Sequence, residues 1–429
     1  MLGWRSRISK LGRRTRSRPD RRSHRPTAKE GRTHVRRNTS ITLLIVLAAC
    51  TAYAQYLPPG TWKHLPSQSI QSGTITVQNY LRGISMVGDD WGVSVGYANL
   101  PNGPQYAYQT LIEQVTQTGA TIMPSWNSSY SVNQLYAVSA DSFSHAVAVG
   151  GAWNPCCIPE VTITEQFNGS AWTPISCPNP GTLTTVLQGV KSFGPDDVWI
   201  VGWYEANQSG APQKTYLAHY DGSRCTQVAS PNPSSAGDAL LAISGSSDTD
   251  LWMCGREGNA NSYHPICFHY SGTSFTTYVL PQGPGNNYGG QINAVSEVST
   301  GDIWGGGQNV GYSTLSLYDN FNGGVWQYEY PQLISGPVDY TPIHGVAGIQ
   351  SNFVWSVSES AGACEIGWWN GVSYDGTTRW NSVPCPQFGQ NYNVYWGLDA
   401  HDTNYAFAAG NYNTLSGPMQ TSIAMYSVP

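Results

Sequence analysis

Polar and aromatic side chains recur at one position of a repeated segment, and their types suit ligand recognition. The segment reads L-x-G/A-V or close to it, and its second residue returns every 51 to 54 residues. The seven residues at that position are Arg82, Tyr136, Gln188, Leu241, Asn293, His344 and Trp396. A purely structural position in a repeat converges on one residue type, as the neighbouring positions do here, whereas this one varies. We therefore expect ligand binding by Arg82, Tyr136, Gln188, Asn293, His344 and Trp396; packing against water and one another is the alternative interpretation.

Catalysis needs more than such a set of side chains. Glycoside hydrolysis requires two convergent carboxylates, and the acids expected on long loops are scattered over the chain: Glu160, Glu205, Asp238, Glu257, Asp339 and Glu359. A lyase-type site built from Arg82, Tyr136 and His344 stays open. A sialidase-like arginine cluster is not supported, because residues 38–429 hold only four arginines. No catalytic residue is assigned, and neither a cofactor nor a metal ion is expected, since the paired acids of the short turns are interpreted as turn caps.

The elements that position these residues follow from an internal repeat. Seven similar units begin at Leu81, Leu135, Leu187, Leu240, Ile292, Ile343 and Tyr395. Each unit contains four short apolar segments separated by turn residues, which predicts four β-strands. Four strands in a repeat of about 50 residues are typical of a β-propeller blade. We expect an all-β protein, a seven-bladed β-propeller with four antiparallel strands per blade.

Three units carry an acid, a tryptophan and a glycine together, in "PDDVWIVG" (Pro195–Gly202), "DTDLWMCG" (Asp248–Gly255) and "TGDIWGGG" (Thr300–Gly307). We expect the acid to close the first hairpin, the tryptophan to pack between blades and the glycine to end the second strand. The seventh unit lacks a fourth strand, whereas "PGTWKHLP" (Pro59–Pro66) precedes the first unit. Pairing of this N-terminal strand into the last blade closes the ring and leaves no exposed sheet edge. In such a ring the seven varied side chains meet at the mouth of the central channel.

The pattern from Pro59 to the C-terminus resembles secreted bacterial β-propellers with "DVWAVG"-type repeats and, more loosely, kelch repeats. Kelch blades usually end their second strand in a glycine pair, and only Gly150–Gly151 and Gly305–Gly307 comply. The segment "SYDGTTRW" (Ser373–Trp380) resembles the Asp-box of sialidase-like propellers. The resemblance implies a fold alone, because these families include lectins, enzymes and interaction platforms.

The long loops are rich in Asn, Gln, Tyr, Trp, Ser and Gly. Aromatic rings stack on the C–H faces of sugars, and amides exchange hydrogen bonds with sugar hydroxyl groups, although ordinary turns have a similar composition. We expect an exported, lectin-like binding protein that uses this face to recognise carbohydrate. The alternatives are a polysaccharide-active hydrolase or lyase with its site at the channel mouth, and a cell-surface adhesion or protein-interaction platform. The expected protein is a monomer whose partner is a glycan or another surface protein.

Charge is divided unevenly along the chain. Residues 1–37 hold fourteen Lys and Arg against two acids, whereas the remainder holds seven against 24. This acidic remainder argues against nucleic acid as a partner. The basic start precedes the apolar run Ile41–Ala49, which is an order typical of signal peptides and too short to span a bilayer. We expect residues 1–54 to be a signal segment, cleaved after Ala54 or lipidated at Cys50, and residues 55–429 to be the propeller. The protein is then secreted or a cell-surface lipoprotein, in contact with a membrane only through that anchor.

Eight cysteines remain in residues 55–429, and an even number in an exported chain predicts disulfides. Cys254 and Cys267 flank one predicted hairpin, and Cys364 and Cys385 flank another, so these are the expected pairs. A bond between the adjacent Cys156 and Cys157 is a further alternative.

Overall fold

The computed structural model describes residues 58–71, 76–100, 107–206, 211–259, 262–281, 289–309, 315–322, 324–328, 342–360, 362–371 and 380–429. The chain divides into two units, Met1–Ala54 and Gln55–Pro429. The expected signal segment, with Cys50 and Ala54, lies outside the described residues, as do Asp339 and all of the Asp-box-like segment except Trp380. In the described part every regular element is a β-strand, and no helix there is long and apolar enough to cross a membrane.

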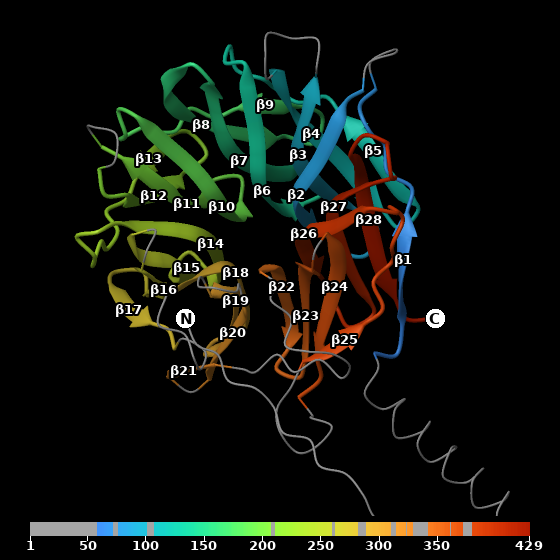
Figure 1. Ribbon diagram of the computed structural model, residues 1–429. Helices are drawn as coiled ribbons and strands as arrows, with labels where there is room; N and C mark the ends of the chain where they lie inside the picture. Colours follow the sequence, from blue (N-terminus) through green and yellow to red (C-terminus); the bar gives the residue numbers. More distant parts are fainter. Residues whose placement is uncertain are drawn as a thin grey trace, which may run out of the picture. The chain divides into compact units, whose positions relative to one another are not determined.

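The strands occupy four positions that recur in each repeat unit (Figure 1). The innermost strands are β2 (Gln78–Met86), β6 (Val132–Ser142), β10 (Thr184–Gly194), β14 (Asp238–Ser247), β18 (Gly290–Ser299), β22 (Ile343–Gln350) and β26 (Tyr392–Ala400). The second strands are β3 (Gly92–Leu100), β7 (His145–Asn154), β11 (Asp197–Glu205), β15 (Asp250–Asn259), β19 (Asp302–Asn309), β23 (Phe353–Ser360) and β27 (Tyr405–Asn413). The third strands are β4 (Ala107–Thr116), β8 (Cys157–Phe167), β12 (Lys214–Tyr220), β16 (Ser262–Tyr270), β20 (Leu315–Asn322), β24 (Ala363–Trp369) and β28 (Gln420–Ser427). The outermost strands are β5 (Gly119–Met123), β9 (Trp172–Pro174), β13 (Cys225–Gln227), β17 (Phe275–Val279), β21 (Val325–Tyr328), β25 (Asn381–Val383) and β1 (Thr61–Leu65).

Hydrogen bonding joins these strands in a pattern that differs in part from separate four-stranded units. Strands β14–β17, β18–β21 and β22–β25 form three separate four-stranded sheets, and β26–β28 form a fourth with β1. Strands β2–β13 form one twelve-stranded sheet. Two parallel residue pairs join its three antiparallel groups, Tyr108 with Val132 and Glu160 with Thr184. These contacts arise where the third strand of one unit meets the start of the next unit's innermost strand.

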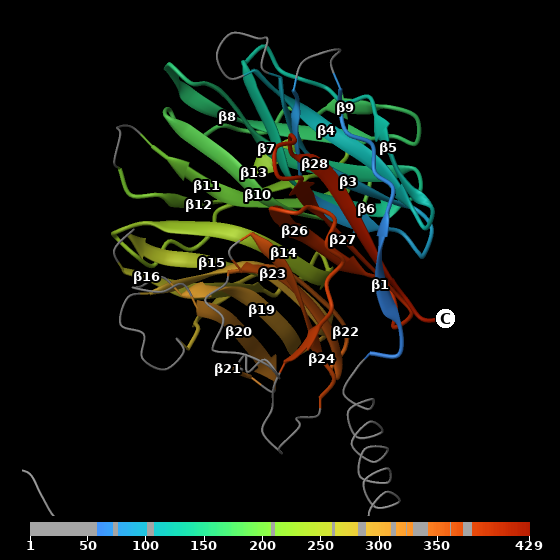
Figure 2. The same cartoon turned by 45° about the vertical axis from the view of Figure 1, so that its right-hand side comes forward.

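The innermost strands follow one another around a common centre (Figures 1 and 2). Each contacts the innermost strand of the next unit, and β26 contacts β2. The N-terminal strand β1 pairs antiparallel with β28, and Trp62 lies opposite Tyr426. The buried ring of Trp62 packs against Trp355 and Tyr426, with centroid distances of 5.3 and 5.9 Å. This all-β arrangement is of the β-propeller type.

A β-bulge interrupts every innermost strand at the same position. In β10 the pairing with β11 passes from Leu187 directly to Gly189, so Gln188 has no partner on the second strand. The same register shift occurs in the other six innermost strands at the corresponding residue. The seven varied residues of the repeat are therefore the seven bulged residues.

The bulge explains the glycine that closes each "VWxVG" segment. Gly202 lies opposite Leu187, and a Cβ on it would stand 2.0 Å from the carbonyl oxygen of Val186. Five other units have a glycine with the same close approach, and Ser358 occupies the position in the remaining one. The expectation that this glycine ends the second strand is wrong, because β11 continues past Gly202 to Glu205. In the six units with glycine, the close carbonyl oxygen of the bulged strand leaves no room for a Cβ.

The acid and the tryptophan of the repeated segment tie the second strand to the third. Asp197 accepts hydrogen bonds from the indole N–H of Trp199 (3.1 Å) and from Nε2 of His219 (2.9 Å). The rings of Trp199 and His219 pack with centroids 4.7 Å apart. In the next unit Asp250 accepts from His269 in the same way (2.7 Å). These residues hold the scaffold and take no part in the central cavity.

Three disulfides join described residues. Cys254 and Cys267 are directly opposed on β15 and β16, and Cys364 of β24 bonds to Cys385 beyond β25; both pairs are the expected ones. The third bond, Cys177–Cys225, was not expected and links two consecutive units. Cys156 is also in a disulfide, whereas the side chain of Cys157 lies outside the described residues.

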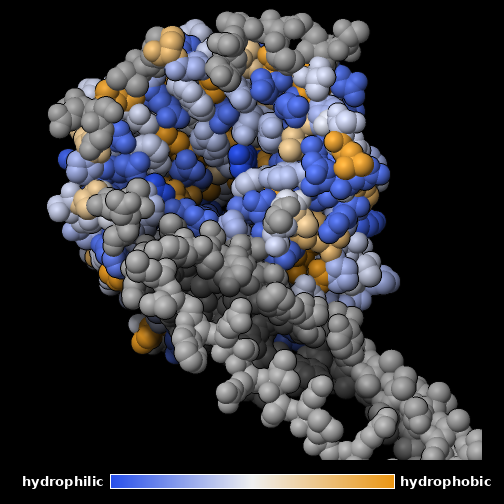
Figure 3. All heavy atoms as spheres, viewed as in Figure 1, coloured by the Kyte–Doolittle hydropathy of each residue, from blue (hydrophilic) through white to orange (hydrophobic). Residues whose placement is uncertain are grey.

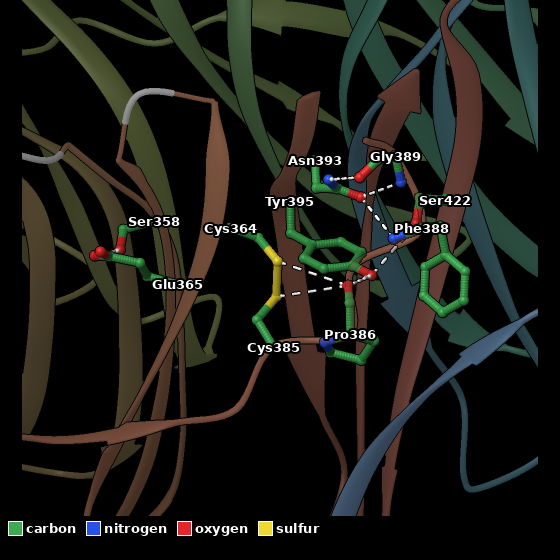
Figure 4. Close-up of a disulfide and its surroundings, with 10 residues drawn as sticks. All are labelled: Ser358, Cys364, Glu365, Cys385, Pro386, Phe388, Gly389, Asn393, Tyr395 and Ser422. Atoms are coloured by element: carbon green, nitrogen blue, oxygen red, sulfur yellow. Dashed lines mark hydrogen bonds between the residues drawn. A yellow bond between two sulfur atoms is a disulfide. The ribbon is translucent and has the colours of Figure 1, made fainter. Parts of the chain in front are cut away.

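The surroundings of Cys364–Cys385 show how the sixth unit is attached to the seventh (Figure 4). The hydroxyl of Tyr395 on β26 lies 3.5 Å from the carbonyl oxygen of Pro386, to which it donates. It accepts from the hydroxyl of Ser422 at 3.3 Å.

Because disulfides persist in oxidising compartments, the three bonds indicate an extracellular or periplasmic location.

Candidate functional site

One central cavity collects the seven bulged positions. Its volume is about 190 Å³, and three consecutive residues of each innermost strand line it. The face seen in Figure 1 is hollowed near its middle (Figure 3). All the residues predicted to bind a ligand line this cavity: Arg82, Tyr136, Gln188, Asn293, His344 and Trp396. Leu241 completes the seven.

Two local features of the sequence bring these side chains together. The bulge removes each residue from the hydrogen-bonded ladder and so re-aims its side chain. The following residue is always glycine or alanine, which lets adjacent strands approach closely. At Gly397, for example, a Cβ would lie 2.9 Å from the Cα of Gly83 in the neighbouring innermost strand. The third position of the L-x-G/A-V segment therefore sets the narrowness of the cavity, and the second position sets its chemistry.

Arg82, Trp396 and His344 form a packed cluster in the cavity wall. The guanidinium carbon of Arg82 lies 4.1 Å from the centroid of the Trp396 ring, and the His344 ring packs on the same indole with a centroid distance of 4.1 Å. Within the described structure, Arg82 Nε and His344 Nε2 are buried and have no hydrogen-bond partner. Trp396 is therefore a platform for its two neighbours, and a simple role as a free stacking surface does not fit.

Neighbouring polar residues orient the cavity side chains. The hydroxyl of Tyr97 accepts a hydrogen bond from Nη2 of Arg82 (3.2 Å). The hydroxyl of Tyr136 donates to Gln134 Oε1 (2.9 Å), and the indole N–H of Trp396 donates to Asn411 Oδ1 (2.9 Å). These supporting residues were not predicted, because the residue type at their positions changes from unit to unit, although Tyr97 and Asn411 each follow the repeated glycine directly.

A longer relay, a chain of hydrogen bonds that starts at Arg256, orients the side chain of Asn293. Both Nη atoms of Arg256 donate to glutamine side chains, to Gln291 at 2.8 Å and to Gln213 at 3.1 Å. Gln291 then donates to Asn293 Oδ1 (2.7 Å), and Asn293 Nδ2 donates to the carbonyl oxygen of Ile343 (2.9 Å). Gln291 precedes Asn293 by two residues, just as Gln134 precedes Tyr136, and this shared offset is a signal in the sequence that points to the supporting residues.

The electrostatic environment keeps His344 neutral. Burial, aided by the nearby charge of Arg82, lowers the pKa of His344 to about 3. Burial, together with the charge of Glu160, raises the pKa of Tyr136 above its usual value. At neutral pH the cavity wall therefore offers an uncharged imidazole, a phenol, two amides and one guanidinium.

The acids considered for hydrolysis lie elsewhere. None of the described residues that line the cavity is acidic. Glu160 and Glu205 flank Thr184 on neighbouring strands, and burial followed by the charge of Glu205 raises the pKa of Glu160 to about 7. Asp238 and Glu257 are paired across β14 and β15, whereas Glu359 accepts a hydrogen bond from Tyr392 (3.3 Å). The structure thus pairs four of these acids, two by two, outside the cavity.

A serine, a histidine and an aspartate also meet, but they are not arranged as a nucleophile and its base. The hydroxyl of Ser192 donates to Asp141, which also pairs with Nδ1 of His145. Nε2 of His145 contacts Gln166 at 2.8 Å, so it does not face the serine. Across the described ranges, no group of three or more His, Cys, Asp or Glu side chains is arranged to hold a metal ion.

Comparison with known proteins finds likenesses in structure alone. No protein-family model matches the chain, and no curated protein matches it. Among solved structures, YCF48 bound to D1 peptide is 12% identical with a TM-score of 0.49, covering 87% of this chain and 96% of that one. The β-propeller domain of the Trilobed protease from Pyrococcus furiosus is 10% identical with a TM-score of 0.46, covering 82% and 96%. A xyloglucanase from Xanthomonas campestris is 13% identical with a TM-score of 0.49, covering 85% and 55%. At such identities these likenesses concern the fold, and no function is taken from them.

Proposed function

We propose that this protein is an exported, seven-bladed β-propeller that binds carbohydrate at the mouth of its central channel. One observation carries the proposal: seven bulged positions converge on a single cavity, and six of their side chains are polar or aromatic. A concave, rigidly held pocket with a few polar groups is the usual form of a ligand site.

The blade count rests on the repeating strand order. Seven innermost strands follow one another, the last contacts the first, and β1 supplies the outermost strand beside β28. This arrangement supports closure of the ring by the N-terminal strand, because β28 otherwise has an open edge. A closed ring holds the cavity walls in place from all sides.

The chemistry of the cavity favours sugar hydroxyl groups. Gln188 and Asn293 supply amides, which both donate and accept hydrogen bonds. His344 is neutral, so it too exchanges hydrogen bonds with hydroxyl groups without adding charge. The ring of Tyr136 supplies an aromatic face of the kind that packs on the C–H side of a pyranose. The relay through Arg256 and Gln291 keeps Asn293 in one orientation, which lowers the entropic cost of binding.

Binding is favoured over catalysis at this cavity. Hydrolysis calls for two carboxylates near the scissile bond, and none of the described lining residues has one. Elimination calls for a base whose conjugate acid has a pKa near the working pH, whereas that of His344 is about 3. The experiment below therefore has to distinguish a lectin from two alternatives. These are a polysaccharide hydrolase or lyase and a protein-interaction platform.

Export is supported by the three disulfides and by the order of residues 1–54, a basic start followed by an apolar run. Cleavage after Ala54 yields a soluble protein that begins at Gln55, and lipidation yields one anchored at Cys50. The intact mass of the exported chain distinguishes these two forms. Recovery of the full-length chain from the cytoplasm would contradict export.

The proposed function is tested by glycan-array binding of residues 55–429 combined with a reducing-sugar assay. We expect binding without product release. The substitutions Tyr136→Ala, His344→Ala and Trp396→Ala should each weaken binding at least tenfold while shifting the melting temperature by only a few degrees. Phe143→Ala, an aromatic residue 64% exposed and outside the cavity, is the matched control. Unchanged binding in all three cavity variants would move the site to the loops, and product release would support the enzyme.

A further inference from the structure

Arg82 is a cation in the cavity wall without an acidic partner. The ion pairs among the described residues all join a histidine to an aspartate, and none involves Arg82. Glu359 is close enough for the charge of Arg82 to lower its pKa, but it lies beyond ion-pair distance and accepts its hydrogen bond from Tyr392. The described part of the cavity lining therefore contains one positive charge and no negative one.

The guanidinium is held in a fixed plane. It packs on Trp396 at 4.1 Å and lies 5.7 Å from the centroid of the Tyr97 ring. Its hydrogen bond to the Tyr97 hydroxyl comes from Nη2 (3.2 Å), and its Nε is buried without a partner. An arginine side chain that already packs against aromatic rings loses little conformational freedom when it binds a ligand. Its planar guanidinium can donate two parallel hydrogen bonds to a carboxylate.

A comparison with Arg256 shows what is missing at Arg82. Arg256 also packs on a tyrosine, with its guanidinium carbon 4.6 Å from the centroid of Tyr263. Both of its Nη atoms, however, donate to glutamine side chains of the protein. Arg256 is a structural arginine whose two Nη atoms are both used within the protein, whereas Arg82 donates to a described residue through Nη2 and not through Nη1.

We infer that the sugar bound at the channel mouth is acidic, a uronic acid whose carboxylate pairs with Arg82. This inference rests on the proposed carbohydrate binding and names the class of sugar. The neutral groups of the cavity, Asn293, Gln188 and His344, contact the ring hydroxyls, and Arg82 contacts the carboxylate. The net negative charge of residues 38–429 opposes attraction of an anion from a distance. Selection for the acid therefore depends on direct contact with Arg82.

The test compares ligands that differ only in this charge. Trisaccharides of galacturonic, glucuronic and mannuronic acid, their methyl esters and the neutral galactose, glucose and mannose trisaccharides are titrated by calorimetry into residues 55–429. A short peptide with a free C-terminal carboxylate and its amide form a separate arm. The protein variants are Arg82→Gln and Arg224→Gln; the second removes the same charge from an exposed turn away from the cavity.

We expect at least one uronate to bind at least tenfold more tightly than its methyl ester. Arg82→Gln should abolish this preference, so that the uronate and its ester bind with equal affinity, whereas Arg224→Gln should keep it. Equal affinity for acid and ester, or a preference that survives Arg82→Gln, overturns the inference and leaves carbohydrate binding standing. Absence of binding to every sugar overturns the proposed function as well, and binding of the free-carboxylate peptide alone assigns the site to a protein partner instead.

Discussion

At the scale of single residues, the repeated glycine and the varied residue opposite it form one device. The bulge removes one residue of the innermost strand from the hydrogen-bonded ladder. It also brings the backbone of that strand to the place where a Cβ on the second strand would lie. The glycine at position 202 therefore depends on the close approach of the Val186 carbonyl oxygen and is independent of the chemistry of the Gln188 side chain. The conserved and the variable halves of the repeat are linked through the backbone alone.

Gly202→Ala should destabilise the protein by about 2 kcal/mol or more, because the new Cβ would lie 2.0 Å from the carbonyl oxygen of Val186 and one of the two strands must move. Ser358→Ala, at the corresponding position of the sixth unit, is the matched control, since a Cβ is already accommodated there. It should cost less than about 1 kcal/mol. Denaturant unfolding of both variants measures these changes, and equal costs would contradict the steric explanation.

At the scale of elements, much of the strand arrangement could be predicted. The alternating apolar segments and their even spacing indicate four strands per unit, and the N-terminal "GTWKHL" stretch was rightly expected to pair beyond the last strand of the chain. The end of the second strand was predicted wrongly, because glycine is an ordinary sign of a turn and the bulge leaves no mark in the sequence. The parallel pairs at Val132 and Thr184, and the bond between Cys177 and Cys225, depend on how consecutive units approach each other. No pattern within one unit encodes that approach.

The residues that line the cavity could be predicted, but the interactions among them could not. Variation at the second position of the L-x-G/A-V segment pointed to them. The packing of Arg82 and His344 against Trp396 joins three units and has no signal along the chain.

Strand β1 should be essential for a monomeric fold. Removal of residues 55–66 uncovers the edge of β28 and exposes the rings packed on Trp62, so we expect aggregation. Trp62→Ala keeps the strand and should lower the free energy of unfolding by about 3–5 kcal/mol, whereas Lys63→Ala on the exposed side of the same strand should have little effect. Light scattering and melting curves provide the measurement. A truncated chain that stays monomeric and melts like the longer one would contradict closure by β1.

At the scale of the whole molecule, buried carboxyl groups make stability depend on pH. Glu113 and Glu165 are fully buried on β4 and β8, and burial raises the pKa of each to about 7 despite hydrogen bonds from Ser67 and from the backbone of Trp126. A raised pKa means that the folded state favours the protonated acid. The contribution of these two groups to the free energy of unfolding is therefore greatest below about pH 4.5, and it decreases as the pH rises towards 7. His344 acts in the opposite direction, because its lowered pKa destabilises the fold as the pH falls below 6.5.

The acids outnumber this histidine, since Glu160 and Glu297 are also shifted to about 7. We expect a higher melting temperature at pH 5.5 than at pH 8. Glu113→Gln and Glu165→Gln should each stabilise the protein by about 1–3 kcal/mol at pH 8 and by much less at pH 5. Asp196→Asn, on an exposed turn, should have the same small effect at both values. A melting temperature that rises from pH 5.5 to pH 8 would contradict this account.

The seven bulged positions separate the side chains that line the cavity from those that keep the protein folded. Each of the seven positions lies outside the ladder, on a different strand, so one of them can be replaced without altering the pairing around the other six. Duplication of such a unit would add one residue to the cavity lining, and the type of that residue could change without altering the strand pairing. The same property makes the protein a natural scaffold for directed evolution: a library that randomises only these seven codons alters the whole wall of the cavity and leaves every strand as it is.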